Sequence, residues 1–233
     1  MRKYLLVIST LAMITVNALA NTIPFNLITT GEVSSLYPNL FTPASVTFSI
    51  WGAIYFLLVW GTIGLKKIPN TPLIVVYCIN TVANAGWLIA WHYQWLLLGL
   101  MFMIVLLITL IVLVKNPTLK GVFSTAIHMY LAWIMVATIA NVTIVLSTLN
   151  LAILNQELFY LHLILPIGAV LALITAYTTK HVVVMLVFIW AYSGILLRHT
   201  TEFISISLVV LLSLCLLLFI LYAFKLAIKR SLL

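Results

Sequence analysis

Aromatic and amide side chains recur at helical spacing in three apolar stretches of this sequence. Within each stretch they stand three, four or eight positions apart and therefore share one face of a helix. They are Phe48, Trp51 and Tyr55; Asn80, Asn84, Trp87 and Trp91; and Trp133 and Asn141 with Thr138 beside that face. Rings stack on flat apolar molecules, and amides hydrogen-bond to polar edges. These residues therefore predict the wall of a binding pocket that is mostly apolar and has a few fixed polar groups.

The same pattern also fits plain packing, because large rings fill the space between helices and amides in hydrocarbon must find a partner. The depth of these residues in the membrane favours a pocket over packing. At about 1.5 Å per residue, Trp51, Trp87 and Asn141 all lie roughly 10 Å below one membrane surface. We therefore predict a pocket in the outer half of the bilayer, between the helices that begin near residues 43, 71 and 122. Residues 23–42 would form its lid.

Groups for other kinds of chemistry are missing from the apolar runs. None of the three acids lies within a run, which disfavours an ion-coupled transporter, since such carriers usually keep an intramembrane carboxylate. The sequence contains no P-loop, HExxH, paired carboxylates or GxSxG, so common nucleotide-driven and hydrolytic mechanisms lack their parts. No histidines are spaced as a ligand cluster, and we expect no metal site and five interfacial histidines. These are His92, His128, His162, His181 and His199.

The composition is that of a helical membrane protein. Hydrophobic residues make up 65% of the chain and charged residues 6%, with a mean hydropathy of +1.29. The apolar runs are much longer than barrel strands, so the predicted fold is an all-α membrane bundle. Eight transmembrane helices are expected at about 4–20, 43–65, 71–95, 96–114, 122–149, 158–179, 182–198 and 203–224.

Capping residues predict some of the helix starts. Thr42 is expected to cap the second helix with Pro43 in its first turn, and Thr71 is expected to cap the third ahead of Pro72. The first run ends in Ala18-Leu19-Ala20 after a basic start, so a cleaved signal peptide is the alternative to a retained first helix.

The positive charges predict the topology. With the N-terminus inside, ten of the eleven Lys and Arg residues fall at cytoplasmic ends, and Arg198 is the exception. Both termini are therefore predicted to be cytoplasmic, in what we expect to be a bacterial inner membrane. The net charge of +8 is spread over these ends, so the lipid bilayer rather than nucleic acid is the expected partner.

The chain resembles the translocator protein family, also called the tryptophan-rich sensory protein or peripheral benzodiazepine receptor family. Three segments carry the resemblance over about residues 1–150. Thr42-Pro43 with Phe48, Trp51 and Tyr55 resembles the family's Thr-Pro-Pro…Phe…Trp…Leu-Tyr; Asn84-Ala85-Gly86-Trp87 resembles its Asn-x-x-Trp; and Trp133…Ala137-Thr138…Asn141 resembles its Trp-x-x-x-Ala-Thr-x-x-Asn. Ala44 replaces the second proline, and Val46 stands where a tryptophan is common.

The resemblance implies a division of the chain into a five-helix bundle, 1–150, and three additional helices, 151–233. It also implies binding of tetrapyrroles, sterols or related molecules beneath the first loop, porphyrin breakdown in some members, and dimers in many. A bound porphyrin or other tetrapyrrole is the one cofactor expected.

Three functions are in competition. The first is a sensor or carrier for a flat apolar molecule such as a tetrapyrrole or sterol-like compound. The alternatives are a structural or assembly subunit of a larger membrane complex and a porphyrin-degrading enzyme, with no catalytic residue assigned. The expected partners are an apolar small molecule and a second copy or a membrane-complex subunit. The predicted ligand-binding residues are Pro43, Phe48, Trp51, Tyr55, Asn84, Trp87, Trp91, Trp133, Thr138 and Asn141.

Overall fold

The structure is a computed structural model, and it describes residues 2–23, 25–37, 39–148 and 157–199 together with helical positions between 207 and 222. The described residues form helices and connecting turns, without a strand. Its helices are α1 (Arg2–Thr22), α2 (Thr30–Ser35), α3 (Ile50–Ile63), α4 (Thr71–His92), α5 (Leu96–Val114), α6 (Gly121–Thr148), α7 (Glu157–Thr179) and α8 (Val183–Arg198). A short 3-10 helix, η2 (Ser45–Ser49), runs directly into α3.

Six of these helices are long and apolar enough to cross a membrane, with η2 and α3 counted as one. The all-α membrane bundle is therefore as predicted from the composition. The predicted number of eight spans is not established, because α8 has only 16 residues. The predicted span 203–224 falls largely outside the described residues.

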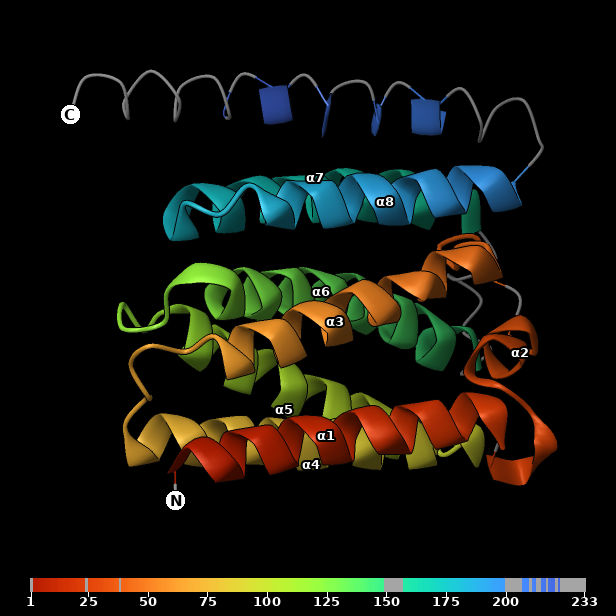
Figure 1. The fold of residues 1–233 in the computed structure, drawn as a ribbon. Helices are drawn as coiled ribbons and strands as arrows, with labels where there is room; N and C mark the ends of the chain where they lie inside the picture. Colours follow the sequence, from red (N-terminus) through yellow and green to blue (C-terminus); the bar gives the residue numbers. More distant parts are fainter. Residues whose placement is uncertain are drawn as a thin grey trace.

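The helices pack in successive layers (Figure 1). α1 pairs with α4, α5 packs against both α4 and α6, and α3 pairs with α6. α8 lies against α6, with α7 beside it. The helices α1 and α3 to α6 therefore form the larger part of the bundle, and α8 connects α7 to it.

The two ends of the bundle differ in charge. Arg2 Nη1 donates to Pro69 O at 3.5 Å and Lys3 Nζ to Ile63 O at 3.2 Å, so the start of α1 lies beside the α3–α4 loop. The α5–α6 and α7–α8 loops lie at this same end (Figure 1). We call it the basic end; it carries Arg2, Lys3, Lys66, Lys67, Lys115, Lys120 and Lys180. Residues 25–37 and 39–44, here called the lid, cover the opposite end, which we call the lid end. Which of the two ends is cytoplasmic stays a prediction from the charge pattern.

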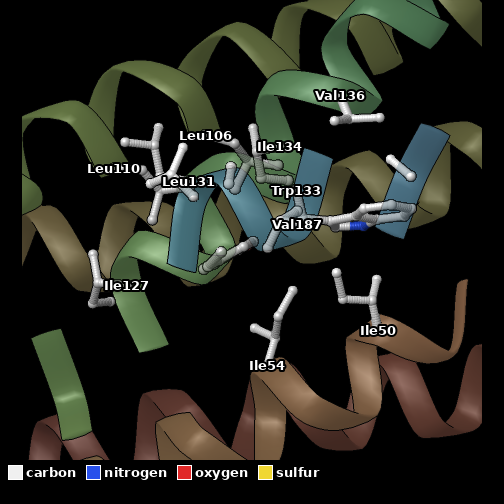
Figure 2. Packing of buried hydrophobic residues seen from close by; sticks show 14 of the residues in the cluster. Ile50, Ile54, Leu106, Leu110, Ile127, Leu131, Trp133, Ile134, Val136 and Val187 are labelled. Atoms are coloured by element: carbon white, nitrogen blue, oxygen red, sulfur yellow. The ribbon is translucent and has the colours of Figure 1, made fainter. Parts of the chain in front are cut away.

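The core between α3, α6 and α8 is mostly aliphatic (Figure 2). Ile50 and Ile54 of α3 lie across from Trp133 and Ile134 of α6, and Val187 of α8 enters the same cluster. All of these side chains are buried. The packing of Val187 shows that α8 contributes to the core and does not merely lie against the outside of the bundle.

Two predicted helix starts are wrong. α4 is capped by Asn70, whose side chain accepts from Leu73 N, and not by Thr71. Thr42 caps nothing, because η2 begins three residues later, after Ala44. The physical reason is a tertiary contact: Ala44 N donates to Gly194 O of α8 at 2.9 Å. That bond holds the chain extended at the position where the local pattern alone favours a helical turn.

Candidate functional site

Trp51 of α3 is the centre of an aromatic cluster at the lid end. Its ring stacks on Tyr55 with centroids 5.4 Å apart, and it meets Tyr130 edge-on at 5.5 Å. Trp87 of α4 and Trp133 of α6 each lie 6.4 Å from it. Trp87 in turn stacks on Trp91, one helical turn further along α4, at 5.9 Å. The rings that the sequence placed on three separate helix faces therefore meet at one point.

A small hollow lies inside this cluster, between α3, α4, α6 and the lid. We call it the aromatic hollow. Its volume is about 30 Å³, enough for little more than a water molecule. Seven of the predicted binding residues line it: Pro43, Phe48, Trp51, Trp87, Trp91, Trp133 and Asn141. The sequence analysis missed Ser34, Thr42, Val136, Ala137, Ala140 and Ile144, which also line it.

The remaining three predicted residues lie elsewhere. Tyr55 lines a neighbouring hollow of about 400 Å³ between α1, α3 and α2, which we call the side hollow. Phe48 and Trp51 line both hollows and so separate them. Thr138 does not line the aromatic hollow and donates its hydroxyl to Ile134 O of its own helix at 2.7 Å.

Asn84 belongs to a buried hydrogen-bond network between helices. Its Oδ1 accepts from Asn17 Nδ2 of α1, and its Nδ2 donates to Tyr130 OH of α6, both at 2.7 Å. The side chain is fully buried. Asn84 thus ties α1, α4 and α6 together and does not line the aromatic hollow, although its spacing matches that of residues that do.

Asn141 is placed differently. Its Nδ2 donates to Ala137 O of its own helix at 2.8 Å, and its Oδ1 accepts only a long bond from Trp87 Nε1 at 3.4 Å. Two other polar atoms of the lining, Trp133 Nε1 and Thr42 Oγ1, are buried without a partner among the described residues. A buried polar atom without a hydrogen bond is costly. The lining of the aromatic hollow therefore has unused hydrogen-bonding capacity.

The lid is bound to the end of α4. Trp91 Nε1 donates to Thr30 O at 3.1 Å, and Tyr37 OH donates to Gln94 Oε1 at 2.9 Å. Within the lid, α2 begins with a capping box in which Thr29 N donates to Glu32 Oε2 and Glu32 N to Thr29 Oγ1. Hydrogen bonding of the exposed Glu32 carboxylate by the Thr29 backbone and, to a smaller extent, by the Thr29 hydroxyl lowers the pKa of that carboxyl. The lid is thus an ordered structure that covers the hollow.

Comparison with protein families shows to which family this chain is related. The family described as TSPO-like protein matches residues 3–223. The chain belongs to this family. Comparison with curated proteins and with solved structures gives no significant match. The family match continues through α7 and α8, beyond residues 1–150 that carry the sequence resemblance.

In this TSPO-like chain α8 holds the lid and η2 in place. Besides the bond from Ala44 N to Gly194 O, Trp190 Nε1 donates to Thr47 O at 2.9 Å and His199 Nε2 donates to Leu40 O at 2.7 Å. A Cβ atom at Gly194 would overlap the side chain of Thr47. Thr47 directly precedes Phe48, so α8 positions one wall of the aromatic hollow. Local pattern gives no signal for this role, which depends on contacts about 150 residues apart.

At its basic end the TSPO-like chain pairs two histidines that the sequence analysis treated as separate. The rings of His128 on α6 and His181 in the α7–α8 loop stack with centroids 3.7 Å apart. Ser124 Oγ is hydrogen-bonded to His181 Nε2 at 3.3 Å, and burial lowers the pKa of His181. Among the described residues no group of three or more His, Cys, Asp or Glu side chains is placed to hold a metal ion.

Proposed function

We propose that this TSPO-like membrane protein binds a flat apolar molecule with polar edges, of the tetrapyrrole or sterol-like kind, at the aromatic hollow, and acts as a sensor or carrier for it. The observation that carries the proposal is the unused hydrogen-bonding capacity of Trp133 Nε1 and Thr42 Oγ1 in a lining made mostly of rings. Rings offer stacking faces, each worth about 0.5–1.5 kcal/mol beyond the area buried. A few fixed polar groups then orient the ligand.

A ligand can enter the aromatic hollow only if one of the aromatic side chains around it moves. The aromatic hollow of about 30 Å³ is far smaller than a usual ligand site of about 300–1,000 Å³. The side hollow of about 400 Å³ lies directly behind Phe48 and Trp51. A rotation of the Trp51 side chain joins the two hollows into one space of suitable size. Binding should therefore change the environment of Trp51 and quench its fluorescence.

The structural-subunit alternative has one observation in its favour, which is how completely the rings fill the site. In that case the cluster is packing, and changes to it alter stability alone. The porphyrin-degrading alternative needs product formation that depends on light or on turnover. The experiment below distinguishes binding from packing, and assay of the bound pigment for breakdown products distinguishes binding from catalysis.

The test is titration with protoporphyrin IX, monitored by its own absorbance, for the wild-type protein and Asn141→Ala. Losing one ligand hydrogen bond should weaken binding about fivefold. The matched control is Asn80→Ala on α4, because Asn80 Nδ2 donates to Thr109 Oγ1 at 2.8 Å and does not line the hollow. That control should lose stability and keep its affinity per folded molecule. If Asn141→Ala also loses only stability, the cluster is packing and the proposal fails.

Trp133→Phe sharpens the same test. It keeps a ring against Phe48 and Trp51, whose centroids lie 5.9 and 6.4 Å away, and removes the buried N–H together with part of the ring volume. Since that N–H has no partner among the described residues, relief of its burial should offset part of the cost of the smaller ring, so stability should change little while affinity falls. A loss of affinity out of proportion to the loss of stability is expected of a ligand donor and not of a packing residue.

A further inference from the structure

A groove opens at the basic end, far from the aromatic hollow. It has a volume of about 630 Å³ and lies where the α3–α4 loop approaches the α5–α6 loop. We call it the lysine groove. Its floor lies where α3 and α6 touch, since a Cβ atom at Gly61 would lie 2.5 Å from the Phe123 Cα. The residues that line it are Trp60, Gly61, Gly64, Leu65, Lys66, Lys67, Pro117, Thr118, Lys120, Gly121, Val122 and Phe123.

Three cations line the lysine groove with no opposite charge beside them. Lys66, Lys67 and Lys120 are exposed, and no described residue forms an ion pair or hydrogen bond with their ammonium groups. Of the chain's acids, Glu32 is in the lid and Glu157 begins α7 at the lid end, while Glu202 lies outside the described residues. By contrast, the ammonium group of Lys3 at the same end is bound to Ile63 O. The groove thus offers positive charge to an external anion.

The walls of the groove are apolar and continue along the face of α3. Trp60 lines the groove with 55% of its surface exposed, and its ring lies 5.7 Å from that of Phe56, which is 64% exposed. Tryptophan prefers the level of the lipid headgroups, where its ring is apolar and its N–H meets water. An anion held in the lysine groove would therefore lie at one end of the apolar surface that Phe56 and Trp60 form along α3.

We propose that the lysine groove binds the headgroup of an anionic phospholipid, with its phosphodiester between Lys66, Lys67 and Lys120 and its acyl chains along Phe56 and Trp60 of α3. Basic pockets between membrane helices attract anionic headgroups, and each nearby Lys or Arg contributes to the attraction. The apolar wall selects a lipid over a soluble phosphate. This site differs from the ligand site proposed above in its position, its residues and its chemistry.

The test uses the full-length protein, delipidated in detergent and titrated with phosphatidylglycerol or with phosphatidylcholine, and counts bound lipids by native mass spectrometry. The variant Lys66→Gln/Lys120→Gln takes one cation from each loop. Its affinity for phosphatidylglycerol should fall roughly thirtyfold, because each lysine near the surface is worth about a factor of five. The matched control is Lys115→Gln/Lys180→Gln, which removes the same charge from the same end but not from the groove. It should keep its affinity within about twofold.

Three results would overturn the proposal: equal binding of the two lipids by the wild-type protein, an equal loss in both double variants, and displacement of phosphatidylglycerol by inorganic phosphate at equal concentration. The first two would mean that no anion site lies in the groove. The third would mean that the site recognises phosphate and not a lipid. If the double variant does not fold, the single variants Lys66→Gln, Lys67→Gln and Lys120→Gln replace it, each with an expected loss of about fivefold.

Discussion

Asn84 and Asn141 are the same residue type, both are buried, and both stand on a helix face beside tryptophans, yet their surroundings differ. Asn84 is 0% exposed and gives and receives short hydrogen bonds with two neighbouring helices. Asn141 is 6% exposed, bonds to its own helix, and receives only a long bond from Trp87. Its neighbours Trp133 and Thr42 have polar atoms that find no partner in the part of the chain that the structure describes.

The difference teaches how to distinguish an amide that holds helices together from one that is available to a ligand. The residue type is the same, and in both cases the spacing puts the asparagine on the helix face of a tryptophan, so neither feature can decide. What decides is whether the surrounding helices supply partners for the polar atoms. A network whose members are all hydrogen-bonded rigidifies the bundle, and a lining with unused capacity is where a ligand gains binding energy. Three substitutions test this contrast.

Gly194→Ala should have the largest effect, because it acts on the wall of the aromatic hollow. The new Cβ would overlap Thr47, and overpacking of this kind costs up to about 3 kcal/mol. As η2 shifts, Phe48 moves with it, so porphyrin affinity should fall together with thermal stability. The control is Gly52→Ala on α3, where a Cβ atom meets nothing within 4 Å. Normal affinity in Gly194→Ala would mean that α8 does not position the hollow.

Asn84→Ala should come next, with a loss of about 2 kcal/mol in the free energy of unfolding. It removes two interhelical hydrogen bonds of about 1 kcal/mol each and leaves the Asn17 amide and the Tyr130 hydroxyl without that partner. Denaturant titration in detergent measures the loss. Porphyrin affinity per folded molecule should not change. A variant with normal stability and weakened binding would reverse the assignment of the two asparagines.

His181→Gln should have the smallest effect. It tests whether stability depends on pH through the basic end, away from both Asn84 and Asn141. Burial lowers the pKa of His181, so the folded protein binds its proton less readily than the unfolded chain does. Stability should therefore be complete above the ordinary histidine pKa of about 6.5 and decline as the pH falls below it. His181→Gln should reduce this decline in melting temperature between pH 7.5 and 5.5. An unchanged decline would place the titrating group elsewhere.

Much of the fold follows from local pattern. Backbone groups in hydrocarbon must pair within their own helix, so long apolar runs predict helices wherever they occur. The six long spans accordingly lie close to their predicted limits. Periodicity also placed Phe48, Trp51 and Tyr55 together, and Trp51 stacks on Tyr55 in the structure. These features depend on residues only a few positions apart, which is why the sequence was sufficient.

The error at Thr42 and the missed histidine pair occur where a distant segment intervenes. Thr42 and Pro43 carry a good local signal for a helix start, but the bond from Ala44 N to Gly194 O, 150 positions away, displaces it. The stacked pair of His128 and His181 joins one helix to a loop 53 residues later. Neither contact leaves a periodic trace in the sequence. Local rules therefore predict the conformation that each segment prefers. They do not predict how a contact with a distant segment changes that conformation.

By itself the sequence determined that this is a helical membrane protein, which residues share a helix face, and that one end is basic. Only the tertiary structure decided that Asn84 ties helices together while Asn141 lines a hollow, that α8 holds the lid and η2, and that three lysines of two loops share one groove. The physical reason is that helix formation and charge placement depend on near neighbours, whereas a side chain's partners depend on how helices rotate and dock. Those rotations are settled by the packing of the whole bundle.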